Sequence, residues 1–136
     1  MRGCARLGGG LADSHRIVAV GDVPAFIGEA TRAVETFEPG CRVVAFGHLG
    51  DGNIHFNVSQ PVGADKACFL ARWDAMNTVV YAIVARLGGS FSAEHGVGRL
   101  KRGLLAQAKD PVSLDVMRRI KAALDPNGVM NPGKVL

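Results

Sequence analysis

The most informative hydrophobic pattern lies between residues 43 and 59. The apolar run at 43–46 is too short for a helix and ends at Gly47. Further along, apolar residues at 54, 56 and 58 alternate with polar residues at 55, 57 and 59, which is the period of a half-buried strand. Between these segments, Asp51 and Gly52 readily supply the positive φ angles of a two-residue turn. The pattern therefore predicts a β-hairpin centred on Asp51 and Gly52.

This hairpin would carry two histidines on one face. Counting outward from Asp51 and Gly52 pairs His48 with His55, and directly opposed side chains have Cβ atoms about 4.5–5.5 Å apart. Asn57 lies two residues beyond His55 and therefore points to the same face. Two imidazoles at this separation can hold one metal ion between them. Two histidines beside a glycine-rich turn also suit an ordinary hairpin.

A second polar segment, residues 92–98, contains Glu94 and His95. Zinc sites commonly take imidazole and carboxylate ligands, so either residue would complete a set with His48 and His55. Because adjacent residues in an extended chain point to opposite sides, Glu94 and His95 cannot easily do the same job. The segment therefore predicts a metal on one side and a titratable imidazole on the other.

The remaining periodicity predicts strands and helices in an α+β order. The expected elements are a strand at 17–20, helices at 22–37 and 65–87 on either side of the hairpin, a segment at 90–98 that is part strand and part loop, a basic helix at 99–108, and a last helix that begins at Asp110-Pro111 and ends at 125–128. This order predicts a ferredoxin-like antiparallel sheet with helices on one face, then C-terminal helices and an extended tail. The other face of the sheet is left for the site.

Composition narrows the function classes. The chain has 136 residues, 48% of them hydrophobic, which suits one globular domain. The net charge of +4 is spread over several segments without a platform for base stacking, so nucleic acid is not expected, and an anionic small substrate fits the charge equally well. Three cysteines without CxxC spacing predict free thiols. With neither a membrane span nor a signal-peptide core in view, a cytoplasmic location is expected.

Three motifs occur in a fixed order: GHLGDGNIH at 47–55, SAEHGVG at 92–98 and DPNGVMNPGK at 125–134. Together they closely resemble the C-terminal domain of FAD-linked 2-hydroxyacid dehydrogenases of the vanillyl-alcohol-oxidase type. That family includes D-lactate dehydrogenases, the glycolate oxidase flavin subunit and D-2-hydroxyglutarate dehydrogenases. The resemblance covers about residues 24–136, so we expect this domain at 15–136, preceded by a flexible or atypical segment at 1–14.

The resemblance implies roles for matching positions. His48, His55 and Glu94 correspond to the ligands of a divalent metal, usually zinc or manganese. His95 corresponds to the active-site histidine that contacts the substrate and takes its hydroxyl proton, and Asn57 to a neighbouring substrate contact. The implied reaction oxidises a small 2-hydroxy acid to a 2-oxo acid and passes a hydride to FAD.

The tail and the missing regions carry further implications. Asn131 and Lys134 correspond to the segment that returns to the flavin side of the site. The family carries its FAD-binding domain N-terminal to this region, and a chain of 136 residues has no room for it. We therefore expect an FAD-binding domain or subunit as partner and no redox activity of the chain alone, while a homodimer stays open. Residues 1–22 do not match the family's substrate-binding Arg and Lys, for which Arg16 is a positional candidate only.

A second reading keeps the same residues and removes the catalysis. In a non-catalytic metal-binding module, a metal held by His48, His55 and Glu94 would only link the hairpin to the segment that contains Glu94. A tightly closed site with four ligands would favour this reading, whereas an open coordination position facing His95 would favour the enzyme.

Overall fold

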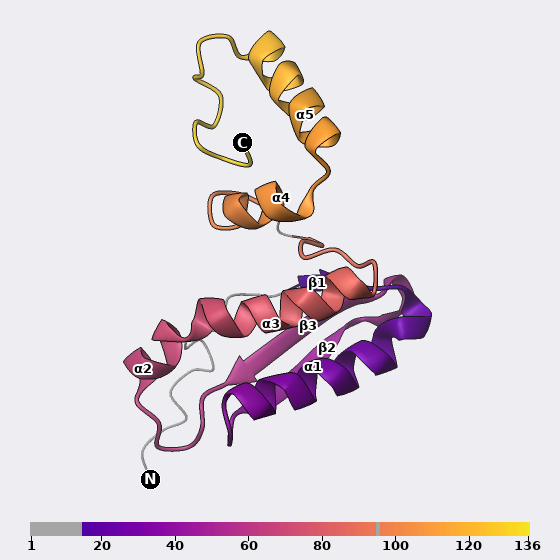
Figure 1. Cartoon of the computed structure of the whole chain (residues 1–136), viewed down its shortest axis with the longest axis vertical. Coiled ribbons are helices and arrows are strands. Elements are labelled where there is room, and N and C mark those ends of the chain that lie inside the picture. Colours follow the sequence, from indigo (N-terminus) through magenta and orange to yellow (C-terminus); the bar gives the residue numbers. More distant parts are fainter. Residues whose placement is uncertain (1–14, 95) are drawn as a thin grey trace. The chain divides into compact units, whose positions relative to one another are not determined.

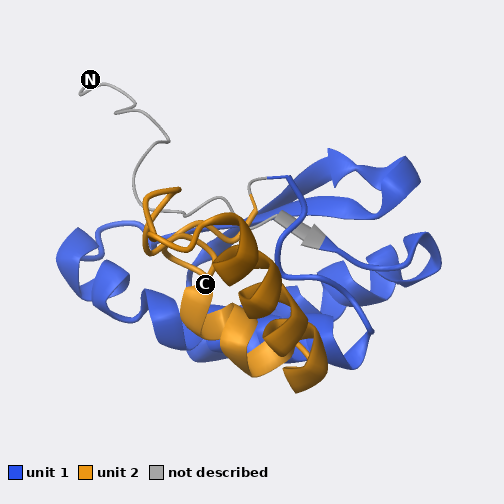
Figure 2. Ribbon diagram, turned by 90° about the horizontal axis from the view of Figure 1, so that it is seen from above, with its two compact units in different colours: residues 1–94 blue, residues 95–136 orange. Residues whose placement is uncertain are grey.

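The computed structural model describes residues 15–94 and 96–136, with His15 and Arg16 described by their backbone alone. The chain divides into two compact units after Glu94. Figure 2 colours the first unit blue and the second orange. Each unit is considered by itself below, and the segment predicted to be flexible or atypical, 1–14, lies outside the described residues.

The first unit contains a three-stranded antiparallel sheet (Figure 1). Strands β1 (His15–Ile17), β3 (Asn53–Ser59) and β2 (Arg42–His48) lie in that spatial order. Helix α1 (Val23–Phe37), preceded by the 3₁₀ turn η1 (Val20–Asp22), connects β1 to β2, so β3 lies between two strands joined by a helix. Ser90 forms a single antiparallel bridge with Ile17 on the free side of β1. This is the ferredoxin-like arrangement of an α+β fold, as predicted, with the fourth strand reduced to one bridge.

Two helices, α1 and α3 (Trp73–Arg86), run side by side and cover one face of the sheet (Figure 1). The buried core comes from three elements: Phe26, Ala30 and Val34 of α1, Ile54, Phe56 and Val58 of β3, and Met76, Val80, Ile83 and Val84 of α3. Burying each large apolar side chain contributes about 1.5–3 kcal/mol. The predicted alternation along β3 is confirmed, and the core fixes which face of β3 points away from the helices.

The predicted helix at 65–87 is two helices, α2 (Lys66–Ala71) and α3, which meet at Arg72. The Arg72 guanidinium donates a hydrogen bond to the carbonyl of Phe37 at 2.8 Å and forms an ion pair with Glu38. It also lies over the Phe37 ring, 4.7 Å from the centroid. The break thus coincides with contacts to the end of α1, which no helical period reveals. The strand predicted at 17–20 is instead β1 at His15–Ile17, and Val20 belongs to η1.

The second unit contains α4 (Arg102–Ala108), α5 (Pro111–Leu124) and the tail. Asp110 caps α5 by accepting the Ser113 N–H at 2.7 Å, as the Asp-Pro pair predicts. Residues 125–136 form no helix or strand, and turns fold them back until the Val135 N–H donates to the Gly98 carbonyl at 2.8 Å. None of the helices in the described ranges is long and apolar enough to cross a membrane.

Candidate functional site

The hairpin turns through four residues. The 3₁₀ turn η2 (Leu49–Asp51) is closed by the Gly52 N–H, which donates to the Leu49 carbonyl at 3.2 Å. The Asp51 carboxylate then accepts the Asn53 N–H at 3.1 Å. Gly52 has φ +72°, and a Cβ added there would lie 1.9 Å from the Val18 carbonyl oxygen, so only glycine fits. The predicted two-residue turn at Asp51 and Gly52 is therefore wrong, because Asp51 stabilises a longer turn built on a 3₁₀ segment.

The longer turn changes the strand register. His48 pairs with Asn53 and His55 pairs with Phe46, so the predicted direct pairing of His48 with His55 is also wrong. The partner of His48 moves by two residues, and an even shift keeps every side chain on its face. His48 and His55 are therefore diagonal neighbours on the face that α1 and α3 leave open, with ring centroids 6.5 Å apart.

Glu94 meets both histidines. Its Oε1 atom lies 3.4 Å from Nδ1 of His48 and 4.0 Å from Nε2 of His55. The bridge at Ser90 explains how a residue distant in sequence arrives here, because Ser90 and Ile17 exchange two backbone hydrogen bonds of 2.8 and 3.0 Å. The His48 side chain is 66% exposed and that of His55 only 16%, so the cluster opens to solvent on the His48 side.

These three side chains are of the types that bind metal ions, but their spacing is not that of a complete metal site. Bonds of about 2.0–2.1 Å in a tetrahedral zinc site place neighbouring ligand atoms about 3.4 Å apart. The distance from Glu94 to His48 matches this spacing, and the distance to His55 exceeds it. Within 15–94 and 96–136, no set of three His, Cys, Asp or Glu side chains forms a ready metal-binding group. His95, the predicted active-site histidine, lies outside the described residues.

Three buried polar atoms lie on β3 and on the segment that contains Glu94. Oδ1 of Asn53, Oδ1 of Asn57 and Oγ of Ser92 have no hydrogen-bond partner in the part of the chain that the structure describes. Each such atom costs about 1–3 kcal/mol, and buried polar atoms of this kind call for an explanation such as a ligand or an ordered water. Asn57 was expected at the site. Sequence reasoning missed Asn53 and Ser92, although both lie inside the motifs, because the register error placed Asn53 opposite Gly50.

The open face of the sheet also carries apolar side chains. Val44 and Phe46 precede His48 at alternate positions of β2, and their exposed fractions are 52% and 51%. Leu49, at the start of the turn, is 58% exposed. Polar site residues and large apolar residues thus share this face, which is typical of a surface that meets another protein surface.

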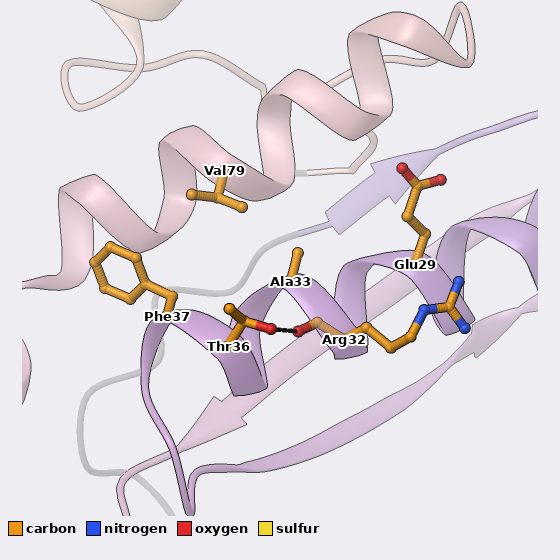
Figure 3. Close-up of a pocket in the computed structure, with 6 residues that line it drawn as sticks. All are labelled: Glu29, Arg32, Ala33, Thr36, Phe37 and Val79. Atoms are coloured by element: carbon orange, nitrogen blue, oxygen red, sulfur yellow. Dashed lines mark hydrogen bonds between the residues drawn. The ribbon is translucent and has the colours of Figure 1, made fainter.

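A groove on the helix side of the first unit is less suited to chemistry. It lies between α1 and α3, and Figure 3 shows its six lining residues: Glu29, Arg32, Ala33, Thr36, Phe37 and Val79. The Thr36 hydroxyl already donates to the Arg32 carbonyl at 2.8 Å, and Glu29 is ion-paired with Arg86. The groove therefore offers an apolar floor with paired polar groups at its rim.

Asn131 and Lys134 lie in an exposed turn of the second unit, where the Lys134 N–H donates to the Asn131 carbonyl at 3.2 Å. The turn begins from a buried anchor. The Asp125 carboxylate, with 2% of its side chain exposed, accepts the N–H groups of Val129 and Met130 and pairs with Lys121 at 2.5 Å. The hydrogen bond from Lys121, followed by those from the two N–H groups, holds the pKa of Asp125 below its ordinary range. The expected flavin contact of Asn131 and Lys134 stays a prediction.

Comparison with known proteins finds a matching family and similar proteins. The family described as "FAD linked oxidases, C-terminal domain" matches residues 16–135. A D-2-hydroxyglutarate dehydrogenase of Stutzerimonas stutzeri is 44% identical over 118 residues, which are 87% of this chain and 25% of that protein. One of Xanthomonas citri pv. viticola is 38% identical over the same shares, and the mitochondrial enzyme of Rattus norvegicus is 44% identical over 69% of this chain and 17% of its own. The chain thus spans a quarter or less of the length of these relatives.

Proposed function

Because the chain belongs to the family of FAD-linked oxidase C-terminal domains, we propose that it is the substrate- and metal-binding domain of an FAD-dependent D-2-hydroxyacid dehydrogenase. Three similar proteins carry the name D-2-hydroxyglutarate dehydrogenase. The observation that carries the proposal is the meeting of Glu94 with His48 and His55 on the helix-free face of the sheet. We propose a small 2-hydroxy acid as substrate and its 2-oxo acid as product.

In this proposal, His48, His55 and Glu94 hold a divalent metal, zinc or manganese. Their donor set of two imidazoles and one carboxylate suits either ion. A small movement of the partly exposed Glu94 would bring its Oε1 to the spacing expected between two ligands of one metal, measured to the nitrogen atoms of both rings. A bound ion supplies Lewis-acid polarisation of the substrate's hydroxyl and carboxylate oxygens. The exposed side of His48 leaves room for the substrate, which favours an open catalytic site over a closed structural one.

The remaining roles are those that the family resemblance implies for matching positions. Asn57 shares the face of His55 and has a buried, unpartnered Oδ1 in the described part of the chain, which supports a polar contact with the substrate. His95 would accept the hydroxyl proton as the carbonyl forms and a hydride leaves C2. FAD, held mainly by a flavin-binding partner domain, supplies the hydride acceptor, and Asn131 and Lys134 would contact it.

The exposed Val44, Phe46 and Leu49 support a partner at this face. A flavin-binding domain seated here would cover the apolar side chains, exclude water from the site and bring the flavin close to the substrate. A homodimer and a cytoplasmic location remain further predictions.

The second candidate function is a non-catalytic metal-binding module. It is favoured by the link that Glu94 makes between the hairpin and the segment after Ser90. The two candidates differ in whether a bound metal keeps an exchangeable position. With cobalt in place of zinc, adding a 2-hydroxy acid should change the visible absorption of the enzyme site and leave that of a closed structural site unchanged.

The primary test is metal and flavin content of the purified chain, by elemental analysis and absorbance. We expect about one equivalent of zinc or manganese and no flavin, because the proposed ligands form a single site and FAD is assigned mainly to the partner domain. Absence of metal after addition of either ion would refute the metal site. Membership of the family would then describe the ancestry of the chain and not its present function. Flavin bound tightly by the chain alone would refute the assignment of FAD to a partner.

A further inference from the structure

Asn53 is a buried residue whose carboxamide donates a hydrogen bond to the carboxylate of Glu94. We propose that Asn53 is a positioning residue: its carboxamide holds Glu94 in the orientation that faces both imidazoles and thereby sets the affinity for the metal. This inference rests on the proposed function, since it assigns a role at the same site. It concerns a residue that acts through Glu94 and does not itself contact the metal or the substrate.

The backbone of Asn53 is fixed on every side. As the first residue of the central strand, it pairs with Ile17 of β1 and with His48 of β2. Its N–H is held by the Asp51 carboxylate at 3.1 Å. Its carbonyl packs so closely against Gly47 that a Cβ added at Gly47 would lie 2.3 Å from it. The backbone from which the Asn53 side chain extends is therefore held by both neighbouring strands and by Asp51.

The carboxamide is aimed at Glu94. Nδ2 of Asn53 donates to Oε1 of Glu94, the same oxygen that lies 3.4 Å from His48 and 4.0 Å from His55. The amide orientation is dictated by chemistry, because a carboxylate only accepts hydrogen bonds and would repel Oδ1. Asn53 is only 4% exposed, so water does not readily replace this donor.

Glu94 needs such a support because its own segment is irregular. Residues 91–94 form neither helix nor strand, and the nearest regular contact is the bridge at Ser90. A glutamate on such a segment has several accessible rotamers, and a fixed donor selects one of them. Outer hydrogen bonds of this kind orient metal ligands, and removing them typically lowers metal affinity about 10–100-fold.

The unused end of the carboxamide strengthens the argument. Oδ1 of Asn53 is buried without a hydrogen-bond partner in the described residues. A side chain selected for stability alone would satisfy both ends or be apolar. An asparagine that keeps one end unpaired while donating to Glu94 is better explained by its effect on that carboxylate.

The test measures zinc affinity of the whole chain by competition with a chromophoric chelator. Asn53→Ser removes the donor, and Asn53→Asp replaces it with a carboxylate that repels Glu94. We expect both variants to bind zinc about 10–100-fold more weakly than the unmodified chain. Asn127→Asp makes the same charge change at an exposed position of the second unit and should leave affinity unchanged.

A double-substitution cycle separates positioning from general support of the fold. If Asn53 acts through Glu94, then Asn53→Ser should cost far less zinc affinity in a Glu94→Ala background than in the unmodified chain. Equal losses in both backgrounds would overturn the inference. So would unchanged zinc affinity of Asn53→Ser and Asn53→Asp while the unmodified chain binds zinc, and that result would leave the proposed function intact.

Two further outcomes remain decidable. If the Asn53 variants fail to fold, the side-chain amide protons of Asn53 in the otherwise unmodified chain can be followed by NMR. They should shift on Glu94→Ala, and an unchanged position would overturn the inference. If the unmodified chain binds no zinc or manganese, the metal site fails, and the positioning role fails with it.

Discussion

The ring of His55 stacks on the ring of Phe46, with centroids 4.6 Å apart and planes 15° from parallel. The two residues are direct partners across β2 and β3, so the strand register itself creates this contact. Phe46 is half exposed, whereas the His55 side chain is only 16% exposed. Phe46 therefore forms one wall of the proposed metal site and limits the rotation of His55.

Phe46→Ala should loosen His55 and weaken zinc binding. Aromatic pairs of this kind contribute about 0.5–1.5 kcal/mol beyond the area that they bury, and a loss of that size is expected in urea unfolding of the metal-free chain. Val44→Ala is the matched control, because Val44 lies on the same face of β2 but opposite Asn57. Phe46→Tyr should retain the affinity. Equal effects of the Val44 and Phe46 substitutions on zinc binding would show that the stacking has no part in it.

The open face of the sheet was predictable from the sequence, while the contacts on it were not. The alternation at 54, 56 and 58 fixed which side of β3 enters the core, and this alone placed His55 and Asn57 outward. The turn depends instead on one side chain, since the Asp51 carboxylate captures the Asn53 N–H. Asp-Gly suits a two-residue turn equally well, so the register could not be chosen from the local sequence.

Gly52→Ala tests this turn. Gly52 combines φ +72° with close contact to the Val18 carbonyl, so an added methyl group is both strained and obstructed. A loss of about 1–3 kcal/mol in the free energy of unfolding is expected from the backbone conformation alone, and the clash should add to it. Gly50→Ala is the control two residues away, where nothing lies within 4 Å and φ is not positive. Its effect should stay within about 0.5 kcal/mol. Similar losses for the two variants, measured by urea unfolding, would contradict the observed turn.

The ligand assignment makes a prediction that distinguishes Glu94 from His95. His48→Ala, His55→Ala and Glu94→Ala should each lose stoichiometric zinc on gel filtration, because each leaves only two of the three proposed ligands and therefore binds zinc much more weakly. His95→Ala should leave the metal bound. Asp74→Asn, a substitution of a carboxylate at the start of α3, serves as control. Elemental analysis after gel filtration provides the measurement, and far-UV circular dichroism checks the fold. Zinc retained by Glu94→Ala but lost by His95→Ala would exchange the two roles.

Tertiary contacts account for most of what the sequence did not reveal. The break at Arg72 arises beside Phe37, the last residue of α1, and Glu38, which follows it. The importance of Asn53 becomes visible only when Glu94, 41 residues later, is placed beside it. Both depend on pairs that are distant in sequence, whereas periodicity reports only which face of an element is buried. The three motifs nevertheless identified the family, since spacing within each motif is local.

The anchor of the C-terminal tail gives a prediction about pH. The pKa of Asp125 is lowered in the folded state, chiefly by the Lys121 hydrogen bond and further by the N–H groups of Met130 and Val129. A lowered folded-state pKa means that the carboxylate adds stability above its ordinary value of 3.8 and loses it as the pH falls through the lowered value. Asp125→Asn should therefore destabilise the tail at neutral pH, and the difference from the unmodified chain should disappear in strong acid. Amide hydrogen exchange of Val129 and Met130 reports this directly at neutral pH, and NMR chemical shifts follow it into acid.

Asp115→Asn is the control, because Asp115 pairs with Arg119 at the same spacing but on the exposed surface of α5. It should change exchange little at any pH. A difference between Asp125→Asn and the unmodified chain that persists below the lowered pKa would show that packing, and not the charge of Asp125, anchors the tail.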